Sequence, residues 1–165
     1  MPLKKAFKFK PHQKLLAVLA FALFIGIVSI EVSNFIDLNG YVKADVIDVD
    51  GNSIIVGEGC TAIIADTSEE RAESILLGLE GKIGERPNTH DVFVDAFKTF
   101  NITINSVTMD RFDGKYYYSS IILTTGEKVL KIDSKPSDAI AIALRAEAPI
   151  YVNKTLLKER GENIC

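Results

Sequence analysis

Tryptophan is absent from the 165-residue sequence, and cysteine and histidine each occur only twice. The scarcity of cysteine and histidine excludes a zinc-cluster protein and a disulfide-dense scaffold, because these classes need several cysteines or histidines at fixed spacings. Cys60 and Cys165 show no metal-ligand spacing. They could pair in an oxidising compartment, but the position of Cys165 at the very end of the chain argues against pairing.

Several sequence fingerprints of catalysis are also missing. The chain has no G-x-S-x-G nucleophile elbow, no Walker loop, no G-x-G-x-x-G and no H-E-x-x-H. No internal repeat or low-complexity segment is present. Any chemistry must therefore come from carboxylates, arginines and histidine placed by the fold.

Charge is distributed unevenly along the chain. Residues 1–30 hold five lysines and no acid, so residues 31–165 hold 14 basic and 22 acidic side chains, a net charge of −8. General nucleic-acid binders usually present a basic field. A role with nucleic acid would therefore need a local basic strip or a bound metal.

The N-terminal segment has the pattern of a membrane anchor. Residues 1–14 are lysine-rich, residues 15–30 carry no charge, and the chain stays fairly apolar to Ile36. We expect residues 15–36 to span a membrane once, with the arm 1–14 in the cytoplasm and the remainder outside. A signal peptide is the alternative, although no small-residue cleavage site is evident after Ile30.

The remaining pattern predicts an α+β fold with a largely antiparallel, barrel-like sheet and three main helices. Gly51 and Gly114 mark hairpin turns, and Thr67-Ser68-Glu69-Glu70 has the form of a capping box. The expected strands are 39–50, 53–57, 60–65, 102–112, 115–123, 128–133 and 150–152. The expected helices are 67–80, 89–100 and 134–145, with a weak fourth helix at 154–160.

The stretch from Asp133 to Arg145 combines a strand exit with the start of a helix. Ser134 suits an N-cap, and Pro136 suits the first helical turn. Asp138 and Arg145 are seven residues apart, so they share one polar face of this helix. Capping and ion pairing alone would also explain these residues.

Candidate catalytic groups gather at the starts of two expected helices. His90 beside Asp91 could act as a general base. Asp91, Asp133 and Asp138 supply the oxygen ligands that magnesium or manganese prefers, and Arg86 and Arg145 could hold a phosphate. The alternative is structural: Asp91 favours the helix dipole and His90 caps a nearby carbonyl.

Tyr116, Tyr117 and Tyr118 form an aromatic run beside Lys115 and Arg111. Aromatic side chains on the surface of a sheet can stack on nucleobases. The alternative is that one tyrosine faces the core and two lie on the sheet surface.

Three segments together resemble the bifunctional nuclease domain family. Arg86-Pro87-x-Thr89-His90-Asp91 resembles one motif, and Glu69-Glu70-Arg71-Ala72 resembles its first helix. Lys135 stands where arginine is usual, and Asn88 where an apolar residue is usual. The longest match is Asp133-x-Lys135-Pro136-Ser137-Asp138-Ala139-Ile140-Ala141-x-Ala143-Leu144-Arg145, followed by Ala148-Pro149-Ile150-Tyr151-Val152.

The resemblance implies a domain at 37–153, followed by a tail at 154–165, and hydrolysis of RNA and DNA phosphodiesters. The expected partners are nucleic acid, the membrane and a second copy of the chain. The alternative function is a non-enzymatic extracytoplasmic module that binds a ligand or a protein. Carried over by position, the catalytic candidates are His90, Asp91, Asp133 and Asp138, the metal ligands are those three aspartates, and the substrate-binding candidates are Arg86, Ser137 and Arg145.

Overall fold

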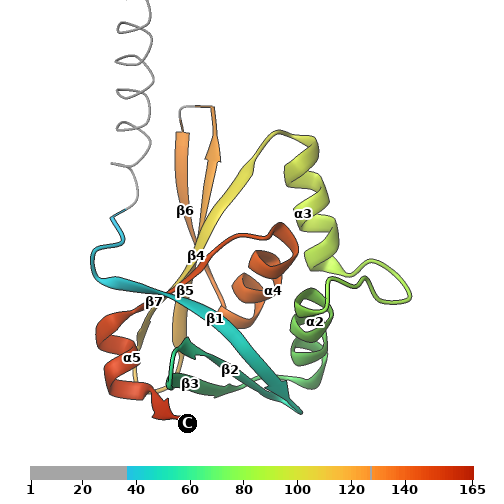
Figure 1. Cartoon of the computed structure of the whole chain (residues 1–165). Coiled ribbons are helices and arrows are strands. Elements are labelled where there is room, and N and C mark those ends of the chain that lie inside the picture. Colours follow the sequence, from blue (N-terminus) through green and yellow to red (C-terminus); the bar gives the residue numbers. More distant parts are fainter. Residues whose placement is uncertain (1–36, 127) are drawn as a thin grey trace, which may run out of the picture. The chain divides into compact units, whose positions relative to one another are not determined.

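One open sheet carries the fold in the computed structural model, which describes residues 37–126 and 128–165 (Figure 1). Its strand order is β6-β5-β4-β7-β1-β2-β3-β8. The strands are β1 (Tyr41–Asp50), β2 (Ser53–Glu58), β3 (Thr61–Asp66), β4 (Thr103–Phe112), β5 (Tyr117–Thr125), β6 (Lys128–Ser134), β7 (Ile150–Asn153) and β8 (Glu162–Asn163). The helices in this part of the chain are α2 (Glu69–Leu79), α3 (Thr89–Thr99), α4 (Pro136–Ala146) and α5 (Lys154–Arg160).

The predicted α+β class is confirmed, whereas the barrel-like closure is not found. Strands β6 and β8 are the two edges of the sheet and do not pair with each other. The expected arm at 1–14 and the expected anchor at 15–36 lie outside the described residues. Within residues 37–126 and 128–165, no helix has the length and apolar character needed to cross a membrane.

Strand β7 joins two locally folded parts of the sheet. Its residues pair antiparallel with the first half of β1, from Tyr41↔Asn153 to Ala44↔Ile150. On its other side β7 pairs parallel with β4, from Val107↔Ile150 to Met109↔Val152. A strand of four residues thus connects β1–β2–β3 to the β4–β5–β6 meander.

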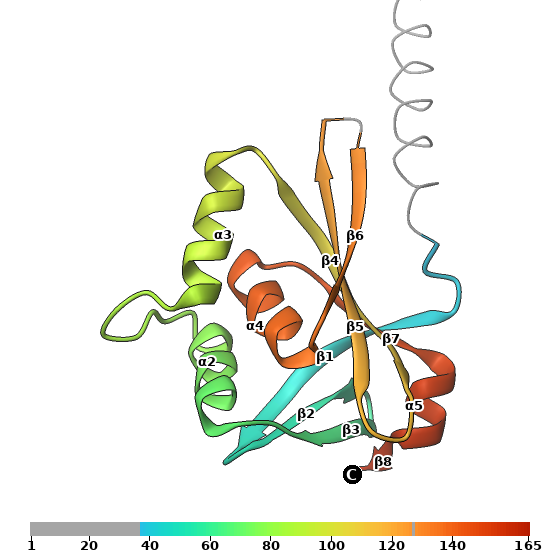
Figure 2. The same ribbon diagram turned by 180° about the vertical axis from the view of Figure 1, so that it is seen from behind.

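Helix α4 lies between the sheet and the two helices α2 and α3 (Figures 1 and 2). Ala139, Ala141 and Ala143 of α4 are fully buried, and these small side chains allow close packing on both sides. Gly78 of α2 serves the same purpose, because an added Cβ would lie 2.8 Å from Nη1 of Arg145. The packing of α2 on α4 therefore requires glycine at this position.

Two expected caps are not formed. Ser68 is the N-cap residue of α2, but its side chain makes no cap hydrogen bond, so the expected capping box is wrong. The N-cap of α4 is Lys135 rather than Ser134, because Ser134 still belongs to strand β6. A capping box is present at α3 instead, formed by Asn88 and Asp91.

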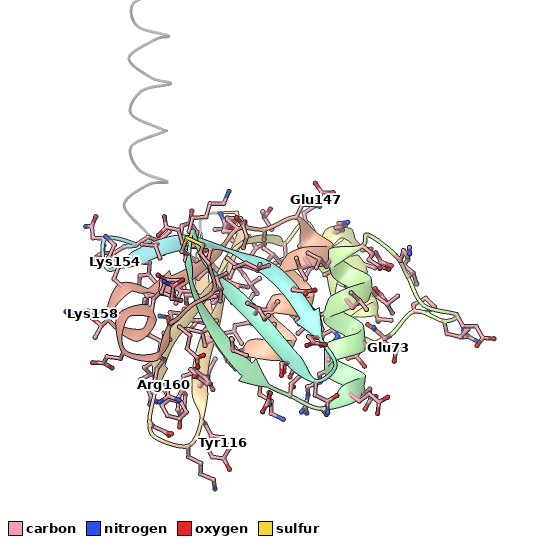
Figure 3. The ribbon with its side chains drawn as sticks, turned by 60° about the horizontal axis from the view of Figure 1, so that its bottom comes forward. Glu73, Tyr116, Glu147, Lys154, Lys158 and Arg160 are labelled. Carbon is pink, nitrogen blue, oxygen red and sulfur yellow. A yellow bond between two sulfur atoms is a disulfide. The ribbon has the colours of Figure 1, made fainter. Side chains whose placement is uncertain are left out.

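A disulfide joins Cys60 to Cys165, although the sequence argued against this pairing. Strand β8 holds the C-terminal end against β3, through the pair Thr61↔Asn163. The backbone N–H of Ile164 also donates to the carbonyl of Cys60 at 3.0 Å. The segment 154–165 thus forms α5 and β8 and is tied to the sheet (Figure 3, yellow bond).

We expect removal of the disulfide to destabilise the domain. The bond closes a loop across 105 residues, so a Cys60→Ser, Cys165→Ser double variant should lose about 2–5 kcal/mol of unfolding free energy. Urea denaturation of the full chain with and without reductant measures this loss. Reductant should shift the wild-type midpoint toward that of the double variant and leave the variant unchanged. Equal midpoints for all samples would contradict the prediction.

Candidate functional site

A buried ion pair connects helices α2, α3 and α4. Nε of Arg145 on α4 donates to Oδ1 of Asp91 on α3 at 2.5 Å. Nη1 of Arg145 donates to the carbonyls of Ser74 on α2 and Ala141 on α4, both at 2.9 Å. The two charged side chains are only 7% and 5% exposed, so this pair is part of the packed interior.

The Asp91 carboxylate is held in its ionised form. Burial alone would raise its pKa, but hydrogen bonds from Arg145 and from the backbone N–H of Asn88 outweigh burial and lower the pKa below its usual range. Among the described residues Nη2 of Arg145 finds no partner. The pair therefore connects the three helices, and ion pairing was the structural alternative that the sequence analysis gave for Arg145.

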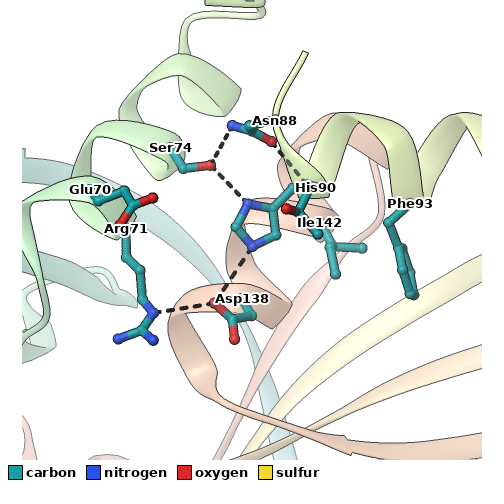
Figure 4. Close-up of a pocket in the computed structure, with 9 residues that line it drawn as sticks. Glu70, Arg71, Ser74, Asn88, His90, Phe93, Asp138 and Ile142 are labelled. Carbon is teal, nitrogen blue, oxygen red and sulfur yellow. Dashed lines mark hydrogen bonds and ion pairs between the residues drawn. The ribbon is translucent and has the colours of Figure 1, made fainter. Parts of the chain in front are cut away.

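A cavity of about 380 Å³ opens beside this ion pair (Figure 4). His90 lies at its centre, with Nδ1 2.9 Å from Oγ of Ser74 and Nε2 3.5 Å from Oδ1 of Asp138. Nε of Arg71 approaches the same Asp138 oxygen at 3.5 Å. The lining residues are Glu70, Arg71, Ser74, Asn88, Thr89, His90, Phe93, Asp138 and Ile142.

The hydrogen-bond network around His90 determines its tautomer. Oδ1 of Asn88 accepts from the backbone N–H groups of His90 and Asp91, so its Nδ2 donates to Oγ of Ser74 at 3.0 Å. The buried hydroxyl of Ser74 then needs an acceptor, and the nearest recorded one is Nδ1 of His90. Neutral His90 therefore carries its proton on Nε2, facing Asp138.

The sequence-derived candidates occupy four different places. Asp91 and Arg145 form the buried pair, and His90 and Asp138 line the first cavity. Asp133 and Ser137 line a second cavity, and Arg86 is exposed in the loop before α3. In residues 37–126 and 128–165, no three His, Cys, Asp or Glu side chains group closely enough to hold a metal ion.

Comparison with known proteins identifies the family of the chain. The family model of the bifunctional nuclease domain matches residues 59–164, which is more than half of the chain. The chain belongs to the bifunctional nuclease domain family. This match covers both helix starts that form the first cavity.

Several curated proteins are similar to this bifunctional nuclease domain. An uncharacterized protein of Mycobacterium tuberculosis is 30% identical over 93 residues, which are 56% of this chain and 55% of that protein. Bifunctional nuclease 1 of Oryza sativa is 30% identical over 79 residues, covering 46% of this chain and 24% of the rice protein. The match thus spans about half of the bacterial relative and a quarter of the plant one.

Two side chains of the first cavity carried no assigned role in the sequence analysis. Arg71 and Ser74 are three residues apart on α2, so they share a face that points at His90 and Asp138. Polar residues at this spacing in an otherwise amphipathic helix were the available signal. Asn88, noted as a departure from the family pattern, connects the α3 cap to Ser74.

We expect loss of the buried carboxylate to destabilise the bifunctional nuclease domain strongly. Asp91→Ala leaves the Arg145 guanidinium buried without its counter-charge and should cost about 3–5 kcal/mol of unfolding free energy. Asp95→Ala removes an exposed carboxylate one turn later on α3 and should cost no more than about 0.5 kcal/mol. Urea denaturation compares the two. Similar costs would show that the buried pair does not hold the helices together.

The same pair predicts a pH dependence of stability. Because folding lowers the pKa of Asp91, its stabilisation is complete above the ordinary aspartate pKa and disappears as the pH falls through the lowered value. Below about pH 4 the unfolding free energy of the wild type should therefore fall more steeply than that of Asp91→Asn. Parallel pH profiles would contradict this assignment.

Proposed function

We propose that this chain is a membrane-anchored phosphodiester hydrolase that cleaves nucleic acid in the cavity around His90. The supporting observation is the joint approach of His90 and Arg71 to the Asp138 carboxylate at the rim of this cavity. The name of the rice relative, a bifunctional nuclease, agrees with this activity.

Arg71 would bind the substrate phosphate. Its recorded side-chain contact within the described residues is made by Nε, so the two terminal nitrogens are free to hold phosphate oxygens. The side chain is 39% exposed and lines the cavity, so a ligand can reach it. Arg86 and Arg145, which the sequence suggested for this task, lie in an exposed loop and in the buried pair.

Asp138 and His90 would divide the proton transfers. The Asp138 contacts within the described residues are made by Oδ1, so Oδ2 can accept a proton from an attacking water. In its imidazolium form, His90 would donate its Nε2 proton to the leaving oxygen and return to the neutral imidazole, while Ser74 and Asn88 fix the ring. This division differs from the sequence-based expectation, in which His90 was the base.

Binding of magnesium or manganese at this site is a further part of the proposal. The residues described do not provide a set of three protein ligands, and Asp133 lines a different cavity from Asp138. Magnesium often relies on one or two carboxylates together with substrate phosphates.

The N-terminal arm and segment 15–36 would place the domain outside the cytoplasm. The lysine-rich arm supports this orientation, and the Cys60–Cys165 disulfide suits an oxidising compartment. A non-enzymatic binding module is the second candidate. The net charge of −8 favours it, because an acidic domain repels nucleic acid.

We expect the purified full chain to cleave labelled RNA and single-stranded DNA. Asp138→Asn and His90→Ala should each lower the rate by about 10²- to 10⁴-fold, because each removes one proton-transfer group. Asp95→Asn, the same change at an exposed aspartate outside the cavity, should retain the wild-type rate. Parallel reactions with EDTA, magnesium and manganese measure metal dependence.

The outcomes separate the two candidate functions. Equal residual cleavage by wild type and both cavity variants would indicate a contaminant and favour the binding module. Cleavage that EDTA abolishes and magnesium restores would support the metal. Full activity in EDTA would rule out a metal requirement.

A further inference from the structure

A second and larger cavity lies next to the first. Its volume is about 580 Å³, within the range of small-molecule sites. Arg71 lines both cavities, and the first turn of α4 supplies Ser137 to one and Asp138 to the other. The lining residues of this second cavity are Ile54, Ala65, Asp66, Thr67, Arg71, Lys115, Tyr116, Tyr117, Tyr118, Asp133, Ser134, Lys135, Pro136 and Ser137.

The β4–β5 hairpin contributes an ordered aromatic wall. Oδ1 of Asp113 accepts from the backbone N–H groups of Lys115 and Tyr116, and Oδ2 accepts from the Tyr118 hydroxyl at 2.8 Å. These hydrogen bonds lower the pKa of Asp113 to about 2, so the turn keeps its anchor at neutral pH. The guanidinium of Arg111 lies 3.4 Å from the centre of the Tyr118 ring.

Tyr116 is the accessible member of this wall. It is 57% exposed and projects from the tip of the hairpin (Figure 3). The Lys115 ammonium lies 4.6 Å from the centre of its ring. An exposed aromatic ring beside a cation offers a flat surface for stacking and a positive charge for phosphate.

Charged groups of both signs line this second cavity. Arg71, Lys115 and Lys135 bring positive charge into a domain that is acidic as a whole. Asp66 accepts a hydrogen bond from Ser53 at 2.7 Å. Asp133 makes no recorded side-chain contact within the described residues, so its oxygens are available to a ligand.

We propose that the second cavity is a nucleotide subsite, which holds the nucleotide next to the phosphate bound in the first cavity. The inference rests on the proposed function, because Arg71 would hold the phosphate that the two sites share. The base would stack on Tyr116, and the Asp133 carboxylate would accept from an amino group on the base edge. Lys135 would contact a second phosphate.

This subsite requires an unpaired base. A base within a duplex is stacked on both faces and its pairing edge is occupied, so it cannot meet the tyrosine ring and Asp133 together. The cavity therefore favours single-stranded RNA or DNA.

Binding to two matched strands tests the subsite. We would measure fluorescence anisotropy of full-length Asp138→Asn protein with labelled octadeoxyadenylate and with an abasic strand of the same length and charge. A second substitution in this protein, Tyr116→Ala, should weaken its binding to octadeoxyadenylate by about 5- to 150-fold and leave its binding to the abasic strand unchanged. Phe100→Ala, at an exposed aromatic outside both cavities, is the matched control.

A second variant tests the phosphate contact. Lys135→Ala should weaken both strands alike and reduce the salt dependence of binding by about 0.7 per lost phosphate contact, because lysine meets the backbone. Base-selective weakening, or an unchanged salt slope, would overturn the role of Lys135.

A cleavage assay of the wild-type protein distinguishes failure of the subsite from failure of the proposed function. If wild-type protein cleaves but Tyr116→Ala binds both strands as Phe100→Ala does, the subsite is wrong and the hydrolase stands. If binding depends on the base and on Tyr116 but no strand is cleaved, the subsite stands and the hydrolase fails. Failure to bind either strand overturns the subsite.

Discussion

The contact between Asp91 and Arg145 is the constraint on which the site depends. It joins α3 to α4, and the same guanidinium reaches the α2 backbone at Ser74. The consecutive helices α2 and α3 and the more distant α4 thereby acquire one fixed relative position. The position of the His90 ring is thereby fixed as well, because His90 lies just after the α3 cap and its ring hydrogen-bonds to Ser74. Asp91 and Arg145, which the sequence analysis expected to act on substrate, form this buried pair.

The secondary structure was largely predictable because the hydrophobic periods and glycine turns are strong. Apolar spacing indicated the helices, and Asp113-Gly114 marked the β4–β5 turn. The order of the strands in the open sheet was not predictable. It depends on β7 inserting between β1 and β4, and a strand of four residues carries little sequence pattern. The alternation of polar and apolar positions also does not indicate whether the two distant cysteines meet.

The sequence analysis named His90 and Asp138 of the first cavity, but it assigned no role to Arg71 and Ser74 and did not predict the pairings. Sequence placed His90 and Asp138 at helix starts, where they are found. It could not decide which carboxylate Arg145 would choose, because Asp138 on its own helix and Asp91 on another were both plausible. Tertiary packing determines that Arg145 pairs with Asp91, whereas Asp138 is approached by Arg71. Local spacing constrains one helix, whereas a site spans several.

The central position of β7 has a consequence for biosynthesis. Strand β1 is synthesised more than a hundred residues before its neighbour β7, and Cys60 precedes its partner Cys165 by 105 residues. Both parts of the sheet therefore keep an unpaired edge until β7 is synthesised. Such distant pairings slow folding, so the sheet should be completed late, after β7 has joined its two parts.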